Sequence, residues 1–443
     1  MKPFGEINLT EALEERPAEG VVRVDRSIFT DQDLFELEME RIWEKVWLFL
    51  GHEGLIPNPN DYFTTQMGRQ PVVVTRDAQG KVNTFINACT HRGSMLARSE
   101  RGNSADFTCG FHGWCFNSSG DLMSVTKESV GGYPDQFDRE NYGLTRVRTE
   151  NYRGFIFATL NDEAESLDEY LQDAKVMIDL LADQGGDDGF EVLKGISTYT
   201  FDANWKLQAE NGVDGYHVHQ GHLNFALTTK NREKIRAEQA GVTKSMDVGG
   251  LGGKDLEGGF FDFGNGHTML WGDWPNDGDR RPNYHMKAEW TEKFGADRAR
   301  WMISRLRNLL LYPNVFIMDQ MSTQVRVFRP LAVNKTEVTV YSIAPKNESP
   351  EMRTHRIRQY EDFFNATGMA TPDDLAEFNY CQKGYAGRKS RWNDMTRGVK
   401  YLTKGSNKHA ESLGLKLRSS GGRLEDEGIF VAQHQRWLDL MKG

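Results

Sequence analysis

Residues 85–114 read FINACTHRGSMLARSERGNSADFTCGFHGW and contain two short segments in which a histidine closely follows a cysteine. In the first segment His91 follows Cys89, and in the second His112 follows Cys109. Each segment therefore offers one thiolate and one imidazole, which are ligands of zinc and of iron–sulfur clusters. The two segments together predict one metal site of the Cys₂His₂ type.

The order of the four ligands separates two kinds of mixed site. Zinc fingers pair cysteine with cysteine and histidine with histidine, whereas each segment here holds one of each. In a Rieske [2Fe–2S] centre, two histidines replace two cysteines on one iron. Gly93 and Gly113 follow the two pairs and suit a backbone that approaches a cluster closely. The spacing favours a Rieske centre, and structural zinc or unrelated buried residues are the alternatives.

The sequence changes its pattern twice around these segments. Phe29–Trp47 has apolar residues at helical spacing, with Thr30 as the expected N-cap, and predicts a helical N-terminal segment over residues 1–48. Residues 49–160 contain short β-rich runs separated by Gly, Asn and Asp turns, which predict a small all-β domain. Residues 161–443 mix strand and helix patterns and predict an α+β domain.

Several elements of this α+β region can be predicted individually. Between residues 314 and 345, the runs NVFIMDQ, TQVRVFRPL and EVTVYSIAP predict neighbouring antiparallel strands. Ser349 and Pro350 predict the start of a helix that ends near Gly368. The Gly-rich stretch 240–285 has no clear period and predicts a loop.

Composition limits the class of protein. The chain has 443 residues, of which 38% are hydrophobic and 27% charged, as in a globular protein of two or three units. Four cysteines are too few for a disulfide framework. The net charge of −10 comes from 54 basic and 64 acidic residues mixed along the chain, which argues against a nucleic-acid partner. An acidic substrate would therefore need a local cation or hydrogen-bond donors.

Two features bear on localisation. The acidic N-terminus lacks the basic head and apolar middle of a secretory signal. No apolar run approaches the roughly 18 residues of a membrane helix. We expect a cytoplasmic protein without a membrane partner.

Residues 209–222, AENGVDGYHVHQGH, form a second cluster of possible metal ligands. Two histidines with one carboxylate make the facial triad of non-heme Fe(II) oxygenases. On an ideal helix His217 and His219 point about 160° apart and cannot share a metal. His217 and His222 point about 140° apart and can share one only where the helix is broken, and Gly221 stands at such a place. The alternative is that these histidines are surface or core residues without a metal.

The third ligand of such a triad cannot be identified by composition among 64 acidic residues. Asp373 and Asp374 are candidates, because they follow Thr371 and Pro372 at the expected start of a helix. However, threonine at the N-cap, proline at the first position and acids in the first turn are also favoured by any helix N-terminus. Metal ligation and helix capping both account for this segment.

The motifs resemble those of the large, catalytic α subunit of Rieske non-heme iron aromatic-ring-hydroxylating dioxygenases, over essentially the whole chain. The two Cys/His segments match the family's Rieske motif, and Asp214-x₂-His217-x₄-His222 matches its mononuclear-iron motif. By position Asp374 corresponds to the third iron ligand, with Asp373 as its neighbour. The surrounding segments, including GRQPVVVTRD and FNATGMATPDDLAEF, are most similar to the benzoate and anthranilate dioxygenase branch.

The resemblance implies an α+β fold in which residues 49–160 form an all-β Rieske domain and residues 161–443 a catalytic domain. The catalytic domain would have an antiparallel sheet flanked by helices, similar to helix-grip or START folds, with segment 1–48 packed on it. Each chain would hold one mononuclear Fe(II) and one [2Fe–2S] cluster, the latter bound by Cys89, His91, Cys109 and His112. A small β subunit, an α₃β₃ assembly and an NADH-dependent flavin and iron–sulfur reductase are implied as partners.

The implied activity is the cis-dihydroxylation of an aromatic carboxylate with O₂. Benzoate would give a cis-1,2-dihydroxycyclohexadiene carboxylate, whereas anthranilate or a 2-halobenzoate would lose the ortho group and CO₂ and give catechol. Asp214 would bridge the iron to the cluster of a neighbouring subunit. A Rieske monooxygenase or demethylase, an electron carrier without an oxygenase site and a zinc-stabilised scaffold protein are the alternatives.

Residues next to the ligands in sequence are candidates for supporting roles. Tyr216 and Glu210 either assist the ligands or are an ordinary packed tyrosine and surface glutamate. Candidates for the lining of a substrate pocket are Gly212, Val213, Met369 and Ala370.

Overall fold

The computed structural model describes residues 9–236, 255–387 and 389–443. The chain forms two compact units. The first, Met39–Leu167, is called the β unit here, and the second, called the mixed unit, joins Met1–Glu38 to Asp168–Gly443. The sequence predicted divisions after residues 48 and 160 instead. No helix within the described ranges is both long and apolar enough to cross a membrane.

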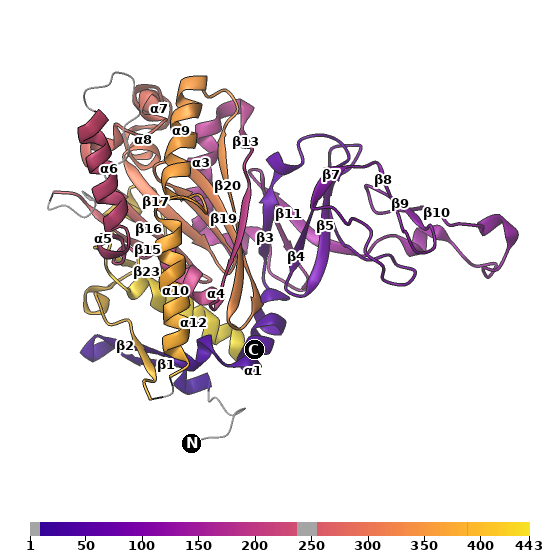
Figure 1. The fold of residues 1–443 in the computed structure, drawn as a ribbon, viewed down its shortest axis with the longest axis horizontal. Helices are drawn as coiled ribbons and strands as arrows, with labels where there is room; N and C mark the ends of the chain where they lie inside the picture. The colour runs from indigo at the N-terminus through magenta and orange to yellow at the C-terminus, as the bar shows by residue number, and fades with distance from the viewer. Residues whose placement is uncertain (1–8, 237–254, 388) are drawn as a thin grey trace. The chain divides into compact units, whose positions relative to one another are not determined.

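The β unit consists of antiparallel strands, as predicted (Figure 1). Its seven-stranded sheet has the order β3-β12-β11-β6-β5-β4-β7, and a three-stranded sheet has the order β10-β9-β8. The bounds of these strands are β3 (Leu48–His52), β4 (Asp61–Met67), β5 (Gln70–Arg76), β6 (Val82–Ile86), β7 (Arg101–Asn103), β8 (Asp106–Thr108), β9 (Cys115–Asn117), β10 (Leu122–Ser124), β11 (Arg146–Tyr152) and β12 (Phe155–Thr159).

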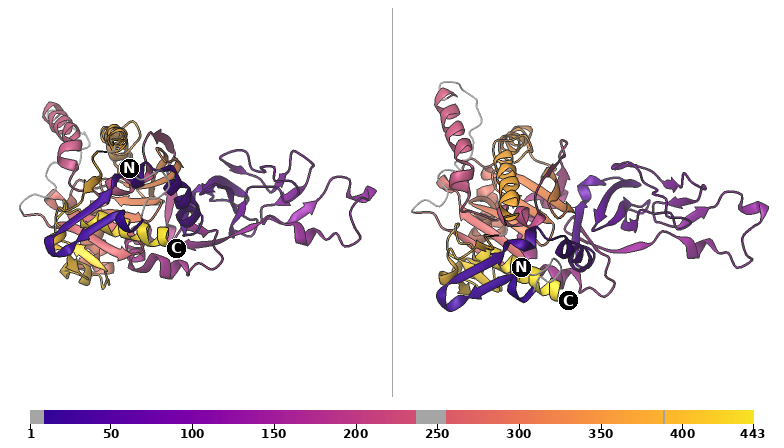
Figure 2. Two further views of the ribbon diagram at one scale, coloured as in Figure 1. Left: turned by 90° about the horizontal axis from the view of Figure 1, so that it is seen from below. Right: turned by 60° about the horizontal axis from the view of Figure 1, so that its bottom comes forward.

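The N-terminal segment 1–48 is not wholly helical, contrary to the prediction. Strands β1 (Leu13–Arg16) and β2 (Val21–Asp25) form an antiparallel hairpin, which β21 (Trp392–Asp394) extends. The two valines at alternate positions of β2 are buried, which is the period of a strand rather than of a helix. Figure 2 shows the hairpin beside the C-terminal helix α12 (Gly428–Lys442).

The helix predicted over 29–47 is shorter than expected. Helix α1 spans Gln32–Glu38, and a π-helix over Met39–Trp43 follows it directly, so the helical run ends before Trp47. Thr30 is not its cap, because Oδ1 of Asp31 accepts the backbone N–H of Leu34 at 3.0 Å. Aspartate is among the residues preferred at an N-cap because its carboxylate can accept a backbone N–H of the first turn.

Glu38 attaches this segment to the rest of the mixed unit. Its buried carboxylate accepts the indole N–H groups of Trp205 at 2.8 Å and Trp437 at 2.7 Å, and it pairs with the buried ammonium of Lys206. These contacts agree with the expectation that the N-terminal segment packs on the larger domain.

A ten-stranded antiparallel sheet forms the centre of the mixed unit. Its main path has the order β13-β20-β19-β18-β17-β16-β15-β23-β22, and β14 also pairs with β20. The three runs predicted between residues 314 and 345 form β18, β19 and β20 in antiparallel neighbourhood, which confirms that prediction. The bounds are β13 (Phe190–Val192), β14 (Ser197–Phe201), β15 (Gly258–Gly264), β16 (His267–Asp273), β17 (Arg305–Leu311), β18 (Val315–Asp319), β19 (Thr323–Ala332), β20 (Lys335–Pro345), β22 (Thr403–Lys404) and β23 (Ser419–Gly421).

The loop predicted over 240–285 is wrong for the part that forms β15 and β16. Residues 237–254 lie outside the described residues. Glycine is needed in β15 because neighbouring chain is very close: a Cβ on Gly259 would come within 2.2 Å of the carbonyl oxygen of Gly421. This close packing, rather than loop formation, accounts for the glycines of this strand.

Helices lie on both faces of the sheet. Gln433 of α12 donates to Thr268 of β16 at 3.4 Å, whereas the ring of Trp301 in α8 (Ala296–Ile303) lies 5.1 Å from that of Trp271. Side chains three positions apart on one strand point to opposite faces, so α12 and α8 lie on opposite sides. In Figure 1, α9 (Pro350–Phe363) and α10 (Thr371–Tyr385) cross in front of the strands.

Helix α9 (Pro350–Phe363) begins as predicted. Oγ of Ser349 accepts the N–H of Met352 at 3.3 Å, which confirms the N-cap. The helix ends before Gly368, which instead lies in the turn that leads to α10 (Thr371–Tyr385). The remaining helices are α2 (Leu167–Leu171), α3 (Lys175–Ala182), α4 (Trp205–Asn211), α5 (Val218–Gly221), α6 (Leu223–Arg236), α7 (Lys287–Phe294) and α11 (Lys408–Glu411).

Candidate active site

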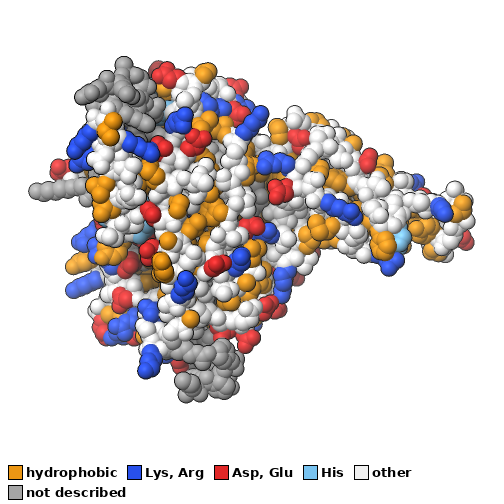
Figure 3. All heavy atoms as spheres, in the orientation of Figure 1, with side chains coloured by type: hydrophobic (Ala, Val, Ile, Leu, Met, Phe, Trp, Pro, Cys, Tyr) orange, Lys and Arg blue, Asp and Glu red, His pale blue; other side chains and the backbone are white. Residues whose placement is uncertain are grey.

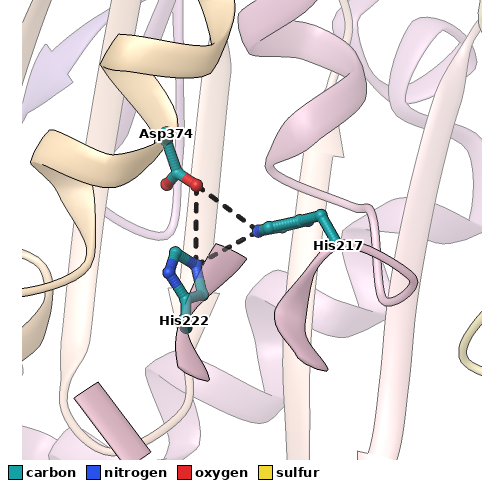
Figure 4. A group of neighbouring side chains, drawn as sticks. All are labelled: His217, His222 and Asp374. Carbon is teal, nitrogen blue, oxygen red and sulfur yellow. Dashed lines mark hydrogen bonds and ion pairs between the residues drawn. The ribbon is translucent and has the colours of Figure 1, made fainter. Parts of the chain in front are cut away.

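Three possible metal ligands meet in the mixed unit (Figure 4). The Nε2 atoms of His217 and His222 lie 3.1 Å apart, and Oδ1 of Asp374 lies 3.5 Å from each of them. Two ligands about 2.1 Å from one ion at a right angle would be about 3.0 Å apart. The three side chains therefore suit one metal ion, and two imidazoles with one carboxylate are the donor set of non-heme Fe(II) sites.

The local chain explains how two histidines of one segment converge. Helix α5 begins after His217 and ends at Gly221, and His222 has non-helical backbone angles (φ −103°, ψ 20°) before α6 begins. The break predicted at Gly221 therefore occurs one residue later. A Cβ on Gly221 would lie 3.2 Å from Cδ2 of His217, so glycine leaves room for that ring.

Asp374 comes from the first turn of α10. Thr371, expected as the N-cap, does not cap this helix; its hydroxyl donates to the carbonyl of Phe364 at 3.0 Å. This hydrogen bond joins the start of α10 to the end of α9 and so directs the first turn toward the histidines. Of the two neighbouring carboxylates, only Asp374 belongs to the cluster of ligand atoms.

Asn211 also lies among the three side chains, although the sequence did not single it out. Its Nδ2 donates to Oδ1 of Asp374 at 3.3 Å and lies 3.4 Å from Nε2 of His217. It precedes the predicted ligands directly in the motif AENGVD, which is the only sequence signal that could have indicated it.

Asp214 supports His217 from the side opposite the cluster. Its Oδ2 lies 3.4 Å from Nδ1 of His217, while its Oδ1 accepts the backbone N–H of Tyr216 at 2.7 Å. A carboxylate at Nδ1 orients the ring so that Nε2 is available to a metal. The geometry of Asp214 thus suits a residue that positions a ligand.

Electrostatics differ between the two histidines. Burial lowers the pKa of His217, but the carboxylates of Asp214 and Asp374 outweigh this effect and raise its pKa above the usual value. For His222 burial dominates and lowers the pKa, although Asp374 opposes it. A metal binds the neutral imidazole and displaces any proton that these carboxylates favour.

Two proposed supporting residues lie elsewhere. The carboxylate of Glu210 pairs with the buried imidazole of His434 at 2.7 Å. Tyr216 is 50% exposed and lies under the guanidinium of Arg397, 4.1 Å from its ring centre. His219 is half exposed and lines the pocket beside the ligands, but it does not belong to the cluster of ligand atoms.

A pocket adjoins the three ligands. Of the lining residues expected from sequence, Gly212 and Ala370 line it, whereas Val213 and Met369 do not. The remaining wall comes from strands and helix ends that carry no local signal of this role. Its main apolar residues are Leu270, Leu306, Met318, Phe363, Phe364 and Leu424.

In the β unit the two Cys/His segments form loops with the same backbone pattern. Cys89 N–H donates to the carbonyl of Ser94, and Gly93 N–H donates back to Cys89; Cys109 is bonded to Trp114 and Gly113 in the same way. Both glycines have positive φ, +73° and +71°. Glycine adopts this left-handed conformation readily, and the close backbone approach to a cluster stays a prediction.

The four predicted cluster ligands approach one another in two pairs, one of cysteines and one of histidines. Cys89 and Cys109 are buried and interact with each other, and the rings of His91 and His112 are 4.6 Å apart. Burial raises the pKa of Cys89, whereas at Cys109 the backbone N–H groups of the loop outweigh burial and lower the pKa. Amide donors directed at a cysteine sulfur favour the thiolate, which is the form that binds iron.

The histidine side of this site is open. His91 is exposed and stacks on Trp114, with 4.9 Å between ring centres and 8° between planes. Trp114 is itself buried, so it packs in the core of the β unit while one face of its ring contacts His91. Phe111 is 56% exposed nearby, and Figure 3 shows histidine and hydrophobic side chains together at the surface of the β unit.

Comparisons with known proteins agree with this division. Residues 46–134 match the Rieske [2Fe-2S] domain, and residues 167–413 match the ring hydroxylating alpha subunit (catalytic domain). The two matches together imply one Rieske [2Fe–2S] cluster and one mononuclear iron in each chain.

Similar sequences extend over nearly the full length. The chain is 48% identical to toluate 1,2-dioxygenase subunit alpha of Pseudomonas putida, over 97% of this chain and 93% of the relative. It is 47% identical to the anthranilate 1,2-dioxygenase large subunit of Acinetobacter baylyi, over 97% and 91%. A structure of naphthalene 1,2-dioxygenase with bound indole covers 95% of this chain and 92% of its own, with a TM-score of 0.78 and 26% identity. The chain therefore belongs to the ring-hydroxylating dioxygenase α subunits, oxidoreductases that combine a Rieske [2Fe–2S] domain with a catalytic domain.

Proposed function

We propose that this chain is the terminal oxygenase subunit that cis-dihydroxylates an aromatic carboxylate. The observation that carries the proposal is the convergence of His217, His222 and Asp374 at the wall of an apolar pocket. The relatives named for toluate and anthranilate support an aromatic carboxylate as the substrate class.

Each ligand has a proposed role. His217, His222 and Asp374 bind the mononuclear iron. The Rieske cluster is bound by Cys89, His91, Cys109 and His112. When bound, the two centres supply electrons and O₂ activation, so the protein has to supply the binding, orientation and exclusion of water.

The residues around the iron ligands have separate tasks. The apolar pocket wall binds the ring and keeps water from it. Asp214 holds His217 by its Nδ1 face and, in the proposed assembly, also connects the site to the Rieske cluster of a neighbouring subunit. Asn211 donates to Asp374 and so limits the rotation of that carboxylate.

The product depends on the ortho substituent. A benzoate without a leaving group gives a cis-1,2-dihydroxycyclohexadiene carboxylate. An ortho amino or halo group leaves after the addition, and loss of CO₂ then gives catechol.

The proposed complex contains further proteins. The names of the relatives as alpha or large subunits support a small β subunit as partner. We further propose an α₃β₃ assembly and a separate NADH-dependent flavin and iron–sulfur reductase.

A metal and product assay tests the function. Anaerobically purified protein, co-expressed with its β subunit, should contain three irons and two acid-labile sulfides per chain. With reductase and ¹⁸O₂ it should insert both oxygen atoms into benzoate, anthranilate or a 2-halobenzoate. Two irons after reconstitution with Fe(II), or insertion of a single oxygen atom as in a monooxygenase, would contradict the proposal.

A further inference from the structure

Arg326 lies in the floor of the pocket and has no assigned role. It stands in β19, opposite Phe316 of β18 and Val340 of β20, and is only 4% exposed. Residues paired across neighbouring strands share a face, so Arg326 lies on the same face as Met318 and its partner Asn308, which also line the pocket. The iron ligands come from the helices that cover this face, whereas Arg326 belongs to the sheet itself.

Arg326 differs from every other buried arginine in the described part of the chain. Arg281 and Arg307 pair with Asp319, Arg305 pairs with Asp273 at 3.0 Å, and Arg356 pairs with Glu348 at 2.6 Å. Arg326 has no carboxylate within ion-pair distance among the described residues, and its buried Nε has no hydrogen-bond partner.

A buried guanidinium without a partner is costly. Arginine does not lose its proton in proteins, so it cannot escape the desolvation penalty by becoming neutral. The charge of Arg326 lowers the pKa of Tyr199, Tyr360 and His222, and none of these three groups is an anion. Burial raises the pKa of both tyrosines, which therefore remain neutral hydroxyls. No carboxylate among the described residues pairs with Arg326, which leaves its guanidinium available to an anion in the pocket.

The charge of the whole site also favours an anion. Two carboxylates, Asp214 and Asp374, line the pocket, and the two positive charges of an Fe(II) ion would balance them. Arg326 adds another positive charge to the same pocket. The chain as a whole carries a net charge of −10, so this local excess is the kind of cation that an acidic substrate needs.

We propose that Arg326 binds the carboxylate of the aromatic substrate. This inference rests on the proposed function and names the residue that selects its substrate class. The planar guanidinium accepts a carboxylate in two parallel hydrogen bonds, and the apolar wall holds the ring. Arg326 thereby anchors one end of the substrate at the sheet and leaves the ring beside the iron ligands.

The test compares charged and neutral substrates in the holoenzyme with its β subunit. Arg326→Gln should lower kcat/KM for benzoate by about 100-fold or more, mainly through KM, because it leaves a carboxylate without its partner. Turnover of benzamide, a neutral analogue of similar shape, should not fall. Arg326→Lys should recover part of the benzoate activity, because it restores the charge without the bidentate geometry.

Arg329→Gln is the matched control. Arg329 lies in the same strand but does not line the pocket, and it pairs with Glu337 at 2.6 Å. Its substitution should leave the benzoate and benzamide kinetics unchanged. Thermal unfolding separates a binding role from a structural one: Arg326→Gln should be at least as stable as wild type, since it removes an unpaired buried charge.

Outcomes of the test separate the two proposals. Wild-type enzyme that oxidises benzamide but no aromatic carboxylate would refute the proposed function. Equal benzoate kinetics in wild type and Arg326→Gln would refute the anchor and leave the function intact. If neither Arg326 variant folds, calorimetry on anaerobic wild-type enzyme decides: equal affinity for benzoate and benzamide overturns the anchor, and a strong preference for benzoate supports it.

Discussion

The two candidate metal sites of this chain are built in different ways. In the β unit, each loop brings one cysteine and one histidine together through the same pair of backbone hydrogen bonds, and all four residues come from one short stretch. In the mixed unit, His217 and His222 come from a broken helix, while Asp374 comes from a helix far along the chain. A site made of local loops can be identified from the spacing of its ligands in the sequence. A site whose ligands come from distant helices depends on how the core folds.

Substitution of Asp374 should have the largest effect, and it should disrupt only the candidate metal site of the mixed unit. Asp374→Ala should abolish ring oxidation and reduce the iron content from three to two per chain, with two sulfides retained. The loss should exceed the about 10- to 100-fold effect of an outer supporting group. Metal analysis and the visible spectrum of the cluster measure this. Asp373→Ala is the control and should keep all three irons; the reverse pattern would overturn the ligand assignment.

Substitution of Asp214 should leave both sites filled and weaken the catalytic one. Asp214→Asn removes the carboxylate beside Nδ1 of His217, and we expect about a 10- to 100-fold loss of turnover with the iron and sulfide content unchanged. Steady-state turnover with metal analysis checks this. Glu425→Gln, which alters a contact of the exposed His219, should have no effect. Normal turnover by Asp214→Asn would exclude its positioning role.

The two loops of the β unit can be compared with each other. Alanine at Gly93 or Gly113 should cost about 1–2 kcal/mol because of the positive φ. At Gly113 a Cβ would also come within 2.1 Å of Oγ1 of Thr126, whereas at Gly93 it meets nothing within 4 Å. The midpoint temperature of thermal unfolding should therefore be lower for Gly113→Ala than for Gly93→Ala. Thr126→Ala should recover part of that difference, and equal stability of the two variants would contradict the steric argument.

The smallest effect concerns the pH dependence of stability in the mixed unit. Burial raises the pKa of Glu427 from its ordinary 4.5 to about 7, and the charge of Asp214 adds to this. Between these two values the folded state binds more protons than the unfolded state, so the free energy of unfolding falls as pH rises. Glu427→Gln should gain stability relative to wild type from pH 5 to pH 7.5 in thermal unfolding. A constant difference over this range would refute the prediction.

Much of the fold followed from local patterns. The antiparallel strands between residues 314 and 345 and the cap at Ser349 were predicted, because alternation and capping depend on neighbouring residues. The strands β15 and β16 were missed, because their glycines are required by close contacts with residues far away in the sequence. The caps expected at Thr30 and Thr371 were also wrong. Asp31, and not Thr30, accepts a backbone N–H at the start of α1. The hydroxyl of Thr371 donates to the carbonyl of Phe364 and so does not cap α10.

The sequence by itself predicted the candidate ligands, their order and a β-rich region followed by an α+β region, because cysteine, histidine and glycine carry their constraints within a few residues. The tertiary structure decided what surrounds the ligands. Asn211 reaches Asp374, Glu210 turns to His434, and Arg326 lies buried in the pocket without a counter-ion. These relations depend on which residues the sheet and its helices bring together, and burial determines the energy of each charge only after the chain has folded.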